Sequence, residues 1–505
     1  VEMLPDGLEA ELIEAAERGE ARRGEGSVEH VEVFRMVSVG TSILGGPRPL
    51  SSHRRPTPGY TLNCEEPLSR PERRRGKGGS DHNGGMDAAR RPTRRGLFGR
   101  RAEEAPVTRV AEARSAGRPG FDYLDSDEVY LDSACQTLRP QPVIDAVQDY
   151  YLHLYACGGR VRYDAGRRVD AEVARVRERT LAALGLSPRH YSCAFTLNTT
   201  YGLNLLLSAL APGRFARIVT TVTEHNAVFL STIAAARRAG IPRVVVERDD
   251  DARVLVDAET MRDAVVVVSA MDNVIGAVTP DLRELITSVH RVGGIVIVDA
   301  AQAAGHALES LRGLDADAIC FSAHKMYGPS LGVVVATREL LLSLEPVMVG
   351  GGQVSAVTAD DFALLPDPHT RLEPGLQAWA EIIGFGAALE WSGDFRSGAG
   401  ETLAAHEARL GARLHAGLAA LPRLQMIGDA SPVISVLPER VDGHRLAAFL
   451  ARGGIAVRSG AFCAHYWILE RRGLGPLVRF SVGAHNTDAD IDRTLEVMTA
   501  MMKGL

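Results

Sequence analysis

Short apolar runs alternate with amphipathic segments from about residue 130 onwards. Seven runs are apolar at nearly every position, and we expect them to be strands: 193–197, 217–222, 243–247, 264–270, 294–299, 317–322 and 332–336. Strands that are apolar on both faces are typical of a mostly parallel sheet covered by helices. The segments between them carry apolar residues at helical spacing, as in 202–210, 229–239 and 281–292. The pattern therefore predicts a three-layer α/β domain with a seven-stranded, mostly parallel sheet flanked by helices.

The pattern changes beyond about residue 375. Long helical segments are expected at 376–391 and 400–421, followed by short strands at 432–437, 455–458 and 477–481. This order predicts a smaller α+β C-terminal domain over 375–505. The large domain is expected over 146–374, and the segment 119–145 is expected to join the small domain.

The first 118 residues differ in composition from the rest. The stretch from about 47 to 101 is rich in Arg, Gly, Pro and Ser and has little periodicity, so we expect a disordered tail over 1–118. An acidic segment at 8–20 could form an isolated helix. The opening residues lack the basic and apolar regions of a signal peptide, which favours a cytoplasmic protein.

Charge, hydropathy and cysteine usage exclude several classes of protein. The net charge of −6 argues against a mainly nucleic-acid-binding protein. No apolar run reaches the length of a membrane-spanning helix, so no membrane association is expected. The six cysteines are scattered, without the spacing of a disulfide framework or of a zinc site, and no metal is expected.

Lysine is almost absent from the chain. Of the 57 basic residues in 505, only Lys77, Lys325 and Lys503 are lysines. A lysine retained within the folded part is a candidate for chemistry that arginine cannot perform. Only Lys325 lies among core-like segments, where it follows directly on a predicted buried strand.

Two strand ends carry candidate catalytic groups. Lys325 lies at the carboxyl end of a strand, where α/β proteins bind their ligands, and burial would make its amine nucleophilic for a Schiff base. The alternative is a surface lysine in a loop. Asp299 ends another buried strand and would need a cationic partner such as a protonated pyridine nitrogen. The alternative for Asp299 is a helix N-cap. Together, Lys325 and Asp299 suggest pyridoxal phosphate.

A phosphate site is expected at a helix N-terminus. Asn198, Thr199 and Thr200 follow a strand and open a helix, although such junctions are common. His225 also follows a strand and could stack on a cofactor ring, although a lone histidine is more often structural.

Several motifs carry a resemblance to a known family. They are SAHK at 322–325, DAAQ at 299–302, VYLDSA at 129–134 and VRFS at 478–481, followed by NTD at 486–488. With these motifs the chain resembles the class V aminotransferases of fold type I, and most closely the cysteine desulfurase/selenocysteine lyase branch. The resemblance covers residues 130–505, about three quarters of the chain.

The resemblance implies a role for each motif residue. Lys325 would hold pyridoxal phosphate as a Schiff base and then move protons. Asp299 would pair with the pyridinium nitrogen, Gln302 would bond the phenolic oxygen, and His225 would stack on the ring and take part in catalysis. The remaining cofactor-binding residues would be Asn198, Thr199, Thr200, Ser322 and His324, the last three at the phosphate. The substrate would contact Asn273, Arg458 and Arg479, with Arg479 clamping its carboxylate.

Cys463 separates two readings of this family. In desulfurases the corresponding segment carries the cysteine that accepts sulfur as a persulfide, and a nearby cation such as Arg458 would favour its thiolate. The alternative is a small buried core residue. The sequence departs from the family at Ala461 and Phe462, which commonly are histidines in this branch. It also departs at Leu376, often a threonine that reaches the partner subunit's phosphate, and only loosely matches at 159–163.

Three functional hypotheses follow. The first is a homodimeric, pyridoxal-phosphate-dependent cysteine desulfurase, a sulfurtransferase that yields L-alanine from L-cysteine and passes sulfur from Cys463 to an acceptor protein. The second keeps the cofactor and makes the chain an aminotransferase, epimerase or C–S lyase for another amino acid or a specialised metabolite. The third is a non-catalytic paralogue with the basic tail as its interaction element.

Overall fold

The computed structural model describes residues 118–124, 128–159 and 161–504. The expected disordered tail and the helix expected at 8–20 lie outside the described residues, apart from Arg118. Arg118 is buried, and its guanidinium pairs with the Asp490 carboxylate at 2.8 Å. Among the described residues, no helix is long and apolar enough to cross a membrane.

Seven strands of the described residues form the main sheet, in the order β2-β8-β7-β6-β5-β3-β4. They are β2 (Tyr191–Thr196), β3 (Arg217–Thr221), β4 (Arg243–Val246), β5 (Ala264–Ser269), β6 (Ile295–Asp299), β7 (Ala318–Ser322) and β8 (Gly332–Thr337). β8 pairs antiparallel with β2 and β7, and the other pairings are parallel. The predicted seven-stranded, mostly parallel sheet is therefore confirmed, with every strand end within two residues of its expected position.

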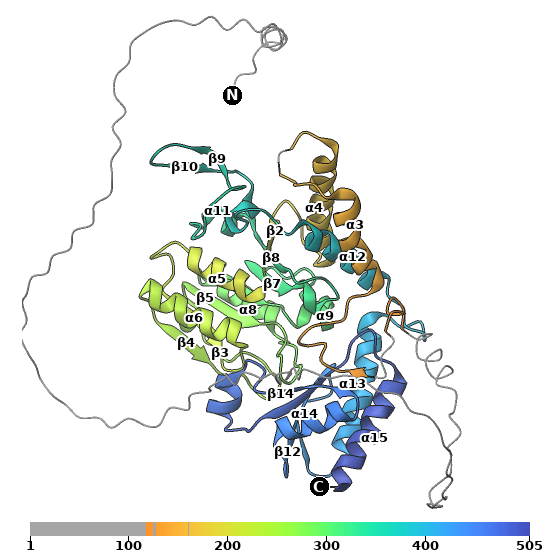
Figure 1. The fold of residues 1–505 in the computed structure, drawn as a ribbon. Coiled ribbons are helices and arrows are strands. Elements are labelled where there is room, and N and C mark those ends of the chain that lie inside the picture. The colour runs from red at the N-terminus through yellow and green to blue at the C-terminus, as the bar shows by residue number, and fades with distance from the viewer. Residues whose placement is uncertain (1–117, 125–127, 160, 505) are drawn as a thin grey trace, which may run out of the picture. The chain divides into compact units, whose positions relative to one another are not determined.

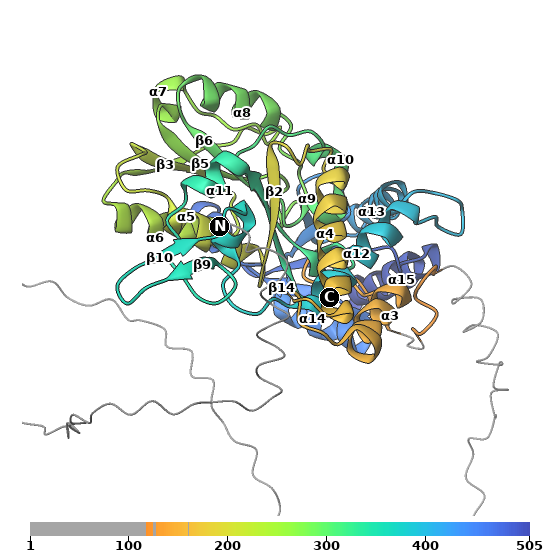
Figure 2. The same cartoon turned by 90° about the horizontal axis from the view of Figure 1, so that it is seen from above.

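Helices cover both faces of this sheet (Figures 1 and 2). One face carries α4 (Asp164–Ala183), α8 (Leu282–Arg291) and α12 (Trp379–Asp394), and the other carries α5 (Thr199–Ala209) and α6 (Asn226–Ala239). Alternate strand residues enter opposite cores: Val266 and Val298 face the first set of helices, and Val267 and Ile297 face the second. The strands read as continuously apolar because both of their faces are buried.

Shorter elements complete this part of the chain. They are α3 (Gln141–Asp149), the π-helical turn η1 (Tyr150–Leu154), α7 (Ala258–Met261), α9 (Ala303–His306), α10 (Leu308–Leu311), the 3₁₀ turn η2 (Ala323–Lys325), α11 (Arg338–Ser343), β9 (Val354–Val357), β10 (Phe362–Leu364) and the 3₁₀ turn η3 (Pro368–Leu372). β9 and β10 form an antiparallel hairpin that extends away from the main sheet (Figure 1). The sequence pattern did not predict this hairpin.

The C-terminal part has a sheet of its own, in the order β11-β12-β15-β14, with antiparallel pairing. Its strands are β11 (Leu424–Ile427), β12 (Val433–Pro438), β14 (Arg458–Gly460) and β15 (Leu477–Ser481). Its helical segments are α13 (Leu403–Ala419), α14 (Gly443–Arg452), the π-helical turn η4 (Tyr466–Arg471) and α15 (Asp488–Gly504). β1 (Val129–Tyr130) pairs in parallel with β13 (Ile455–Ala456), which brings the beginning of the described chain to this part.

The expected boundary at residue 375 stays a prediction, but the packing places α12 with the large sheet. Ile382, Phe385 and Ala388 of this helix belong to the same buried cluster as Phe321 and Val333. The change of packing partner therefore follows α12, because α13 contributes Leu410 and Leu414 to the C-terminal core.

Candidate active site

The structure brings all of the predicted site residues to one pocket of about 260 Å³. Its lining contains Asn198, Thr199, Thr200, His225, Asn273, Asp299, Gln302, Ser322, His324, Lys325, Arg458, Cys463 and Arg479. Most of them follow the carboxyl ends of the parallel strands β2, β3, β5, β6 and β7, which meet at one edge of the sheet. The remaining three come from the C-terminal part.

Lys325 enters the pocket from η2, immediately after β7. Its backbone is packed so closely against α9 that a Cβ atom on Gly305 would lie 2.2 Å from the Lys325 carbonyl oxygen. Burial lowers the pKa of the Lys325 amine, while Asp299 opposes that shift. Burial thus favours the neutral amine, which is the nucleophilic form.

Asp299 is the last residue of β6 and is only 4% exposed. Its Oδ1 accepts a hydrogen bond from the backbone N–H of Ala301 at 2.9 Å. Burial raises the pKa of the carboxyl from 3.8 to about 6, although Ala301 and Lys325 pull it down. The pocket therefore contains a buried carboxylate that a cationic ligand would stabilise.

His225 caps the N-terminus of α6, where its Nδ1 accepts a hydrogen bond from the Ala227 N–H at 3.0 Å. This bond places the proton of the neutral ring on Nε2. Burial, followed by the charge of Lys325, lowers the pKa of His225 to about 3. The ring is therefore neutral at physiological pH and offers a flat surface to the pocket.

The N-terminus of α5 is fixed against β7. The Thr199 N–H donates to Ser322 Oγ at 2.9 Å, and the two hydroxyl oxygens lie 2.6 Å apart. Asn198 accepts from the Tyr201 N–H at 2.9 Å as the N-cap. Thr200 and His324 line the pocket beside them, and burial lowers the pKa of His324 to about 4. Hydroxyls and N–H groups at a helix N-terminus form a place for an anion.

Arg479 and Asn273 line the same pocket and contact each other. Arg479 lies in β15 and is 3% exposed; its Nη1 donates to the Asn273 carbonyl at 2.9 Å, and its Nη2 lies 3.2 Å from Asp132 Oδ1. Arg479 Nε and Asn273 Oδ1 are buried without a hydrogen-bond partner among the described residues. Gln302 is similar. Its Nε2 donates to the Ala134 carbonyl at 2.8 Å, but its Oε1 is buried without a hydrogen-bond partner among the described residues.

Cys463 is exposed on the loop after β14. The backbone φ angles of Phe462 and Cys463 are +47° and +58°, in the left-handed region that costs a non-glycine residue roughly 1–2 kcal/mol each. Two hydrogen bonds hold this conformation. Asn273 Nδ2 donates to the Phe462 carbonyl at 2.7 Å, and the Asn226 N–H donates to the Cys463 carbonyl at 2.5 Å. The loop therefore keeps the thiol at the pocket.

Two pocket-side residues were not predicted as functional. Asp132 pairs with Arg479, and its Oδ2 lies 3.6 Å from Arg458 Nη1. Cys135 lines the pocket, and its Sγ accepts from Arg458 Nη1 at 3.0 Å. Arg458 thus contacts the Cys135 thiol, whereas the sequence suggested that it would serve Cys463. The only sequence signal for both was their place in and beside the motif at 129–134.

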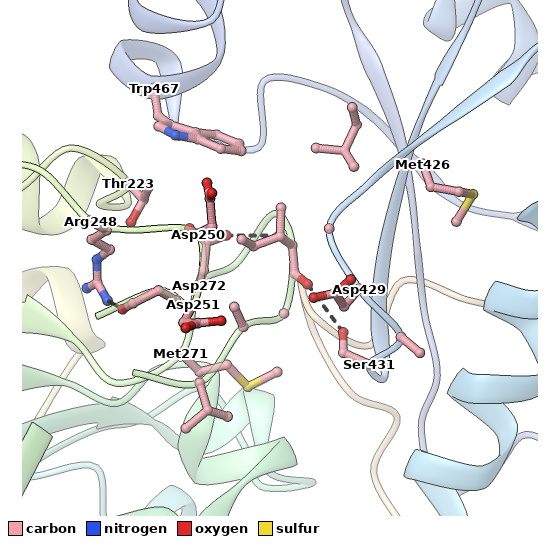
Figure 3. A pocket seen from close by; sticks show the side chains of 18 of the residues that line it. Thr223, Arg248, Asp250, Asp251, Met271, Asp272, Met426, Asp429, Ser431 and Trp467 are labelled. Carbon is pink, nitrogen blue, oxygen red and sulfur yellow. Dashed lines mark hydrogen bonds between the residues drawn. The ribbon is translucent and has the colours of Figure 1, made fainter. Parts of the chain in front are cut away.

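A second cavity lies nearby and is larger, at about 780 Å³. Figure 3 shows Asp250, Asp251, Asp429 and Trp467 around it. It lies between the loops after β4 and β5 and the β11–β12 connection, and none of the predicted site residues lines it. Among the described residues, no group of His, Cys, Asp and Glu side chains is arranged to hold a metal ion. Size alone would point to this cavity, and it too has a buried carboxyl, that of Asp272, whose pKa is raised by burial. No lysine of the described residues lines it, however, whereas the Lys325 amine and the Asp299 carboxyl share the smaller pocket.

Known proteins resemble the chain in sequence and in fold. The profile of the family described as aminotransferase class-V matches residues 129–494. The "Probable cysteine desulfurase" of Chlamydia muridarum is 33% identical over 399 residues, which cover 76% of this chain and 97% of the relative. Cysteine desulfurase CsdA of Escherichia coli is 31% identical over 384 residues, covering 74% and 94% of the two chains.

Solved structures agree with these relatives. The apo structure of a cysteine desulfurase from Thermococcus onnurineus superposes with a TM-score of 0.69 at 27% identity, covering 78% of this chain and 98% of that one. C-DES, solved with a glycine covalently linked to its PLP cofactor, superposes with a TM-score of 0.63 at 20% identity, which shows a likeness of fold alone. The architecture is that of the fold type I enzymes. The chain belongs to the class V aminotransferase family, in its cysteine desulfurase branch.

Proposed function

We propose that this chain is a pyridoxal-phosphate-dependent cysteine desulfurase, which converts L-cysteine to L-alanine and receives the sulfur on Cys463. One observation carries the proposal: a single pocket holds the Lys325 amine and the Asp299 carboxylate, and Cys463 lies in its lining. The desulfurase names of the relatives support the same activity.

The residues of the pocket fit pyridoxal phosphate. Asp299 is a buried carboxylate that a pyridinium nitrogen would stabilise, and Lys325 supplies the amine for the aldehyde. Thr200, at the start of α5, and Ser322 and His324, at the end of β7 and just after it, would bind the phosphate. When bound, the cofactor supplies an electron sink for negative charge at the substrate Cα.

The chain's own residues then bind the substrate and move its protons. Arg479 Nε is a buried donor that has no partner among the described residues, and with Arg458 it would bind the substrate carboxylate. Lys325, favoured as a neutral amine by burial, can take the Cα proton and return it. The neutral imidazole of His225 would stack on the cofactor ring.

The sulfur step balances without a further oxidant. The Cβ–S bond of cysteine breaks and an S–S bond to Cys463 forms, so that cysteine plus the Cys463 thiol gives alanine plus a Cys463 persulfide. The sulfur of the substrate is oxidised as the carbon fragment is reduced. A thiol reductant or an acceptor protein would then remove the outer sulfur.

The protein is proposed to act as a homodimer. The segment around the β9–β10 hairpin exposes apolar side chains, including Val349, Val357 and Phe362, and Leu376 is 75% exposed. Exposed apolar side chains gathered in one segment mark an association surface. A molar mass of two chains in light-scattering measurements would support the dimer. The cytoplasmic location and the sulfur-acceptor protein stay predictions.

The residues before Cys463 also support an alternative activity. Ala461 and Phe462 precede the cysteine, and neither can transfer protons as the histidines of this branch can. This favours, as the alternative, an aminotransferase, epimerase or C–S lyase that uses the same Lys325.

The test is the product of the cofactor-loaded protein with L-cysteine and a thiol reductant. Equal amounts of alanine and sulfide support the desulfurase, whereas pyruvate with ammonia indicates a lyase. A protein that shows the visible absorption of the cofactor yet is inert on cysteine contradicts the proposal, and a screen of other amino acids would follow.

A further inference from the structure

Phe462 belongs to the loop that carries Cys463, and its ring lies against the Arg479 guanidinium. The Arg479 guanidinium carbon is 4.9 Å from the centre of the Phe462 ring, within the range of a cation–π contact. Arg479 Nη1 donates to the Asn273 carbonyl, and Asn273 Nδ2 donates to the Phe462 carbonyl. These three residues therefore form a closed ring of contacts.

The side chain of Phe462 is held by apolar packing. Its side chain is 6% exposed and packs in a small apolar cluster with Val274, Trp467 and Leu477. Its left-handed backbone leads directly into Cys463, which has the same unusual conformation. A displacement of the Phe462 ring would therefore move both the Arg479 contact and the thiol-bearing loop.

The contact with the ring uses none of the arginine's hydrogen-bond donors. A cation–π contact uses the face of the guanidinium and no N–H group, so Arg479 Nε keeps its hydrogen for a carboxylate. A polar side chain at this position could instead accept that hydrogen. A phenyl ring cannot, and it excludes water from one side of the guanidinium, which strengthens a charge-assisted bond on the other side.

We propose that Phe462 is a positioning residue, which holds Arg479 for the substrate carboxylate and ties this clamp to the loop that carries Cys463. The proposal rests on the proposed desulfurase function and assigns a role to a residue at which the chain departs from its branch. It makes carboxylate recognition depend on an aromatic ring that acts through its contact with Arg479.

The experiment compares Phe462→Leu with Phe462→Tyr in the cofactor-loaded protein. Binding of L-alanine and of cysteamine is followed by the change in cofactor absorption, and kcat and KM are measured with L-cysteine. Cysteamine has the amine and thiol of cysteine but no carboxylate, so it reports on damage unrelated to carboxylate binding by Arg479.

In Phe462→Leu we expect the Kd of alanine and the KM of cysteine to rise about fivefold, which corresponds to the middle of the energy range of a cation–π contact. The Kd of cysteamine should stay within twofold, and Phe462→Tyr should keep wild-type values.

Two results would overturn the proposal. One is an unchanged alanine Kd in Phe462→Leu, and the other is an equal loss for alanine and cysteamine, which a merely structural role produces. If Phe462→Leu does not retain the cofactor, Phe462→Met, which also lacks the ring, is measured against the same two ligands. A wild type that makes no alanine from cysteine contradicts the proposed function, whereas the alanine and cysteamine affinities still test Phe462.

Discussion

The two cavities near the junction of the large sheet and the C-terminal part differ in the ionisable groups that line them. The larger one, of about 780 Å³, is lined by the exposed carboxylates Asp250, Asp251 and Asp429 and by the buried carboxyl of Asp272. The smaller one, of about 260 Å³, holds buried Asp299, half-buried Lys325 and a neutral His225. Exposed charges stay solvated and interact weakly, whereas buried ones change their protonation. The larger cavity also has a buried carboxyl, but within the part of the chain that the structure describes only the smaller one combines a buried carboxyl with a lysine amine, and this combination identifies the site better than volume does.

The largest difference in activity between variants of the two cavities is expected at Lys325. Lys325→Ala should lower alanine formation from L-cysteine by on the order of 10⁴-fold, because no other described amine lies in the pocket to move the Cα proton. Steady-state product assays measure the change. Asp250→Asn, in the larger cavity, is the matched control and should stay within twofold of wild type. A comparable loss in the control would mean that the wrong cavity has been identified.

The second largest loss of activity is expected when a cysteine of the smaller pocket is replaced. Cys463→Ala should lower alanine and sulfide production by about 10²-fold while keeping the visible cofactor absorption, because the cofactor contacts remain and only the acceptor is gone. Cys135→Ala should cost less, since its thiol contacts Arg458 and not the loop of Cys463. Equal losses in the two variants would count against the assignment of Cys463.

Asp299 should make the stability of the protein depend on pH. Its folded pKa of about 6 lies above the usual 3.8, so between pH 4 and 6 the unfolded chain has released a proton that the folded chain still holds. Stability of the cofactor-free protein should therefore fall as pH rises through this window, by roughly 3 kcal/mol from this group alone. Urea unfolding at several pH values measures the slope, and Asp299→Asn should lose this contribution. A slope that Asp299→Asn leaves unchanged would contradict the buried carboxylate.

The smallest effect is expected in the larger cavity. The double variant Asp250→Asn, Asp251→Asn changes two exposed side chains, so its unfolding free energy should stay within about 0.5 kcal/mol of wild type. Thermal and urea unfolding test this. A loss of several kcal/mol of unfolding free energy would show that these carboxylates stabilise the fold, which their exposure does not suggest.

The large sheet could be predicted from sequence because its strands are buried on both faces. Runs such as the one that became β5 (Ala264–Ser269) are apolar throughout and resemble no helix or loop. The site residues were predictable for a related reason, since Asp299 and Lys325 follow neighbouring parallel strands whose carboxyl ends meet.

The contacts that the sequence could not give depend on distant segments or on exposure. Arg458 meets Cys135 across 323 positions of the chain, and no local pattern encodes such an approach. The β9–β10 hairpin was missed because Val357 and Phe362 are exposed, so their strands lack a buried pattern. The ring of Phe462 against Arg479 needed the C-terminal fold to be known.

The most direct test is the site of sulfur after a single turnover. The cofactor-loaded protein is mixed with one equivalent of L-cysteine without reductant, alkylated, digested and measured by mass spectrometry. We expect one additional sulfur on the peptide of Cys463 and none on that of Cys135, together with one equivalent of alanine. Alanine formation with an unmodified Cys463, or an additional sulfur on Cys135 alone, would contradict it.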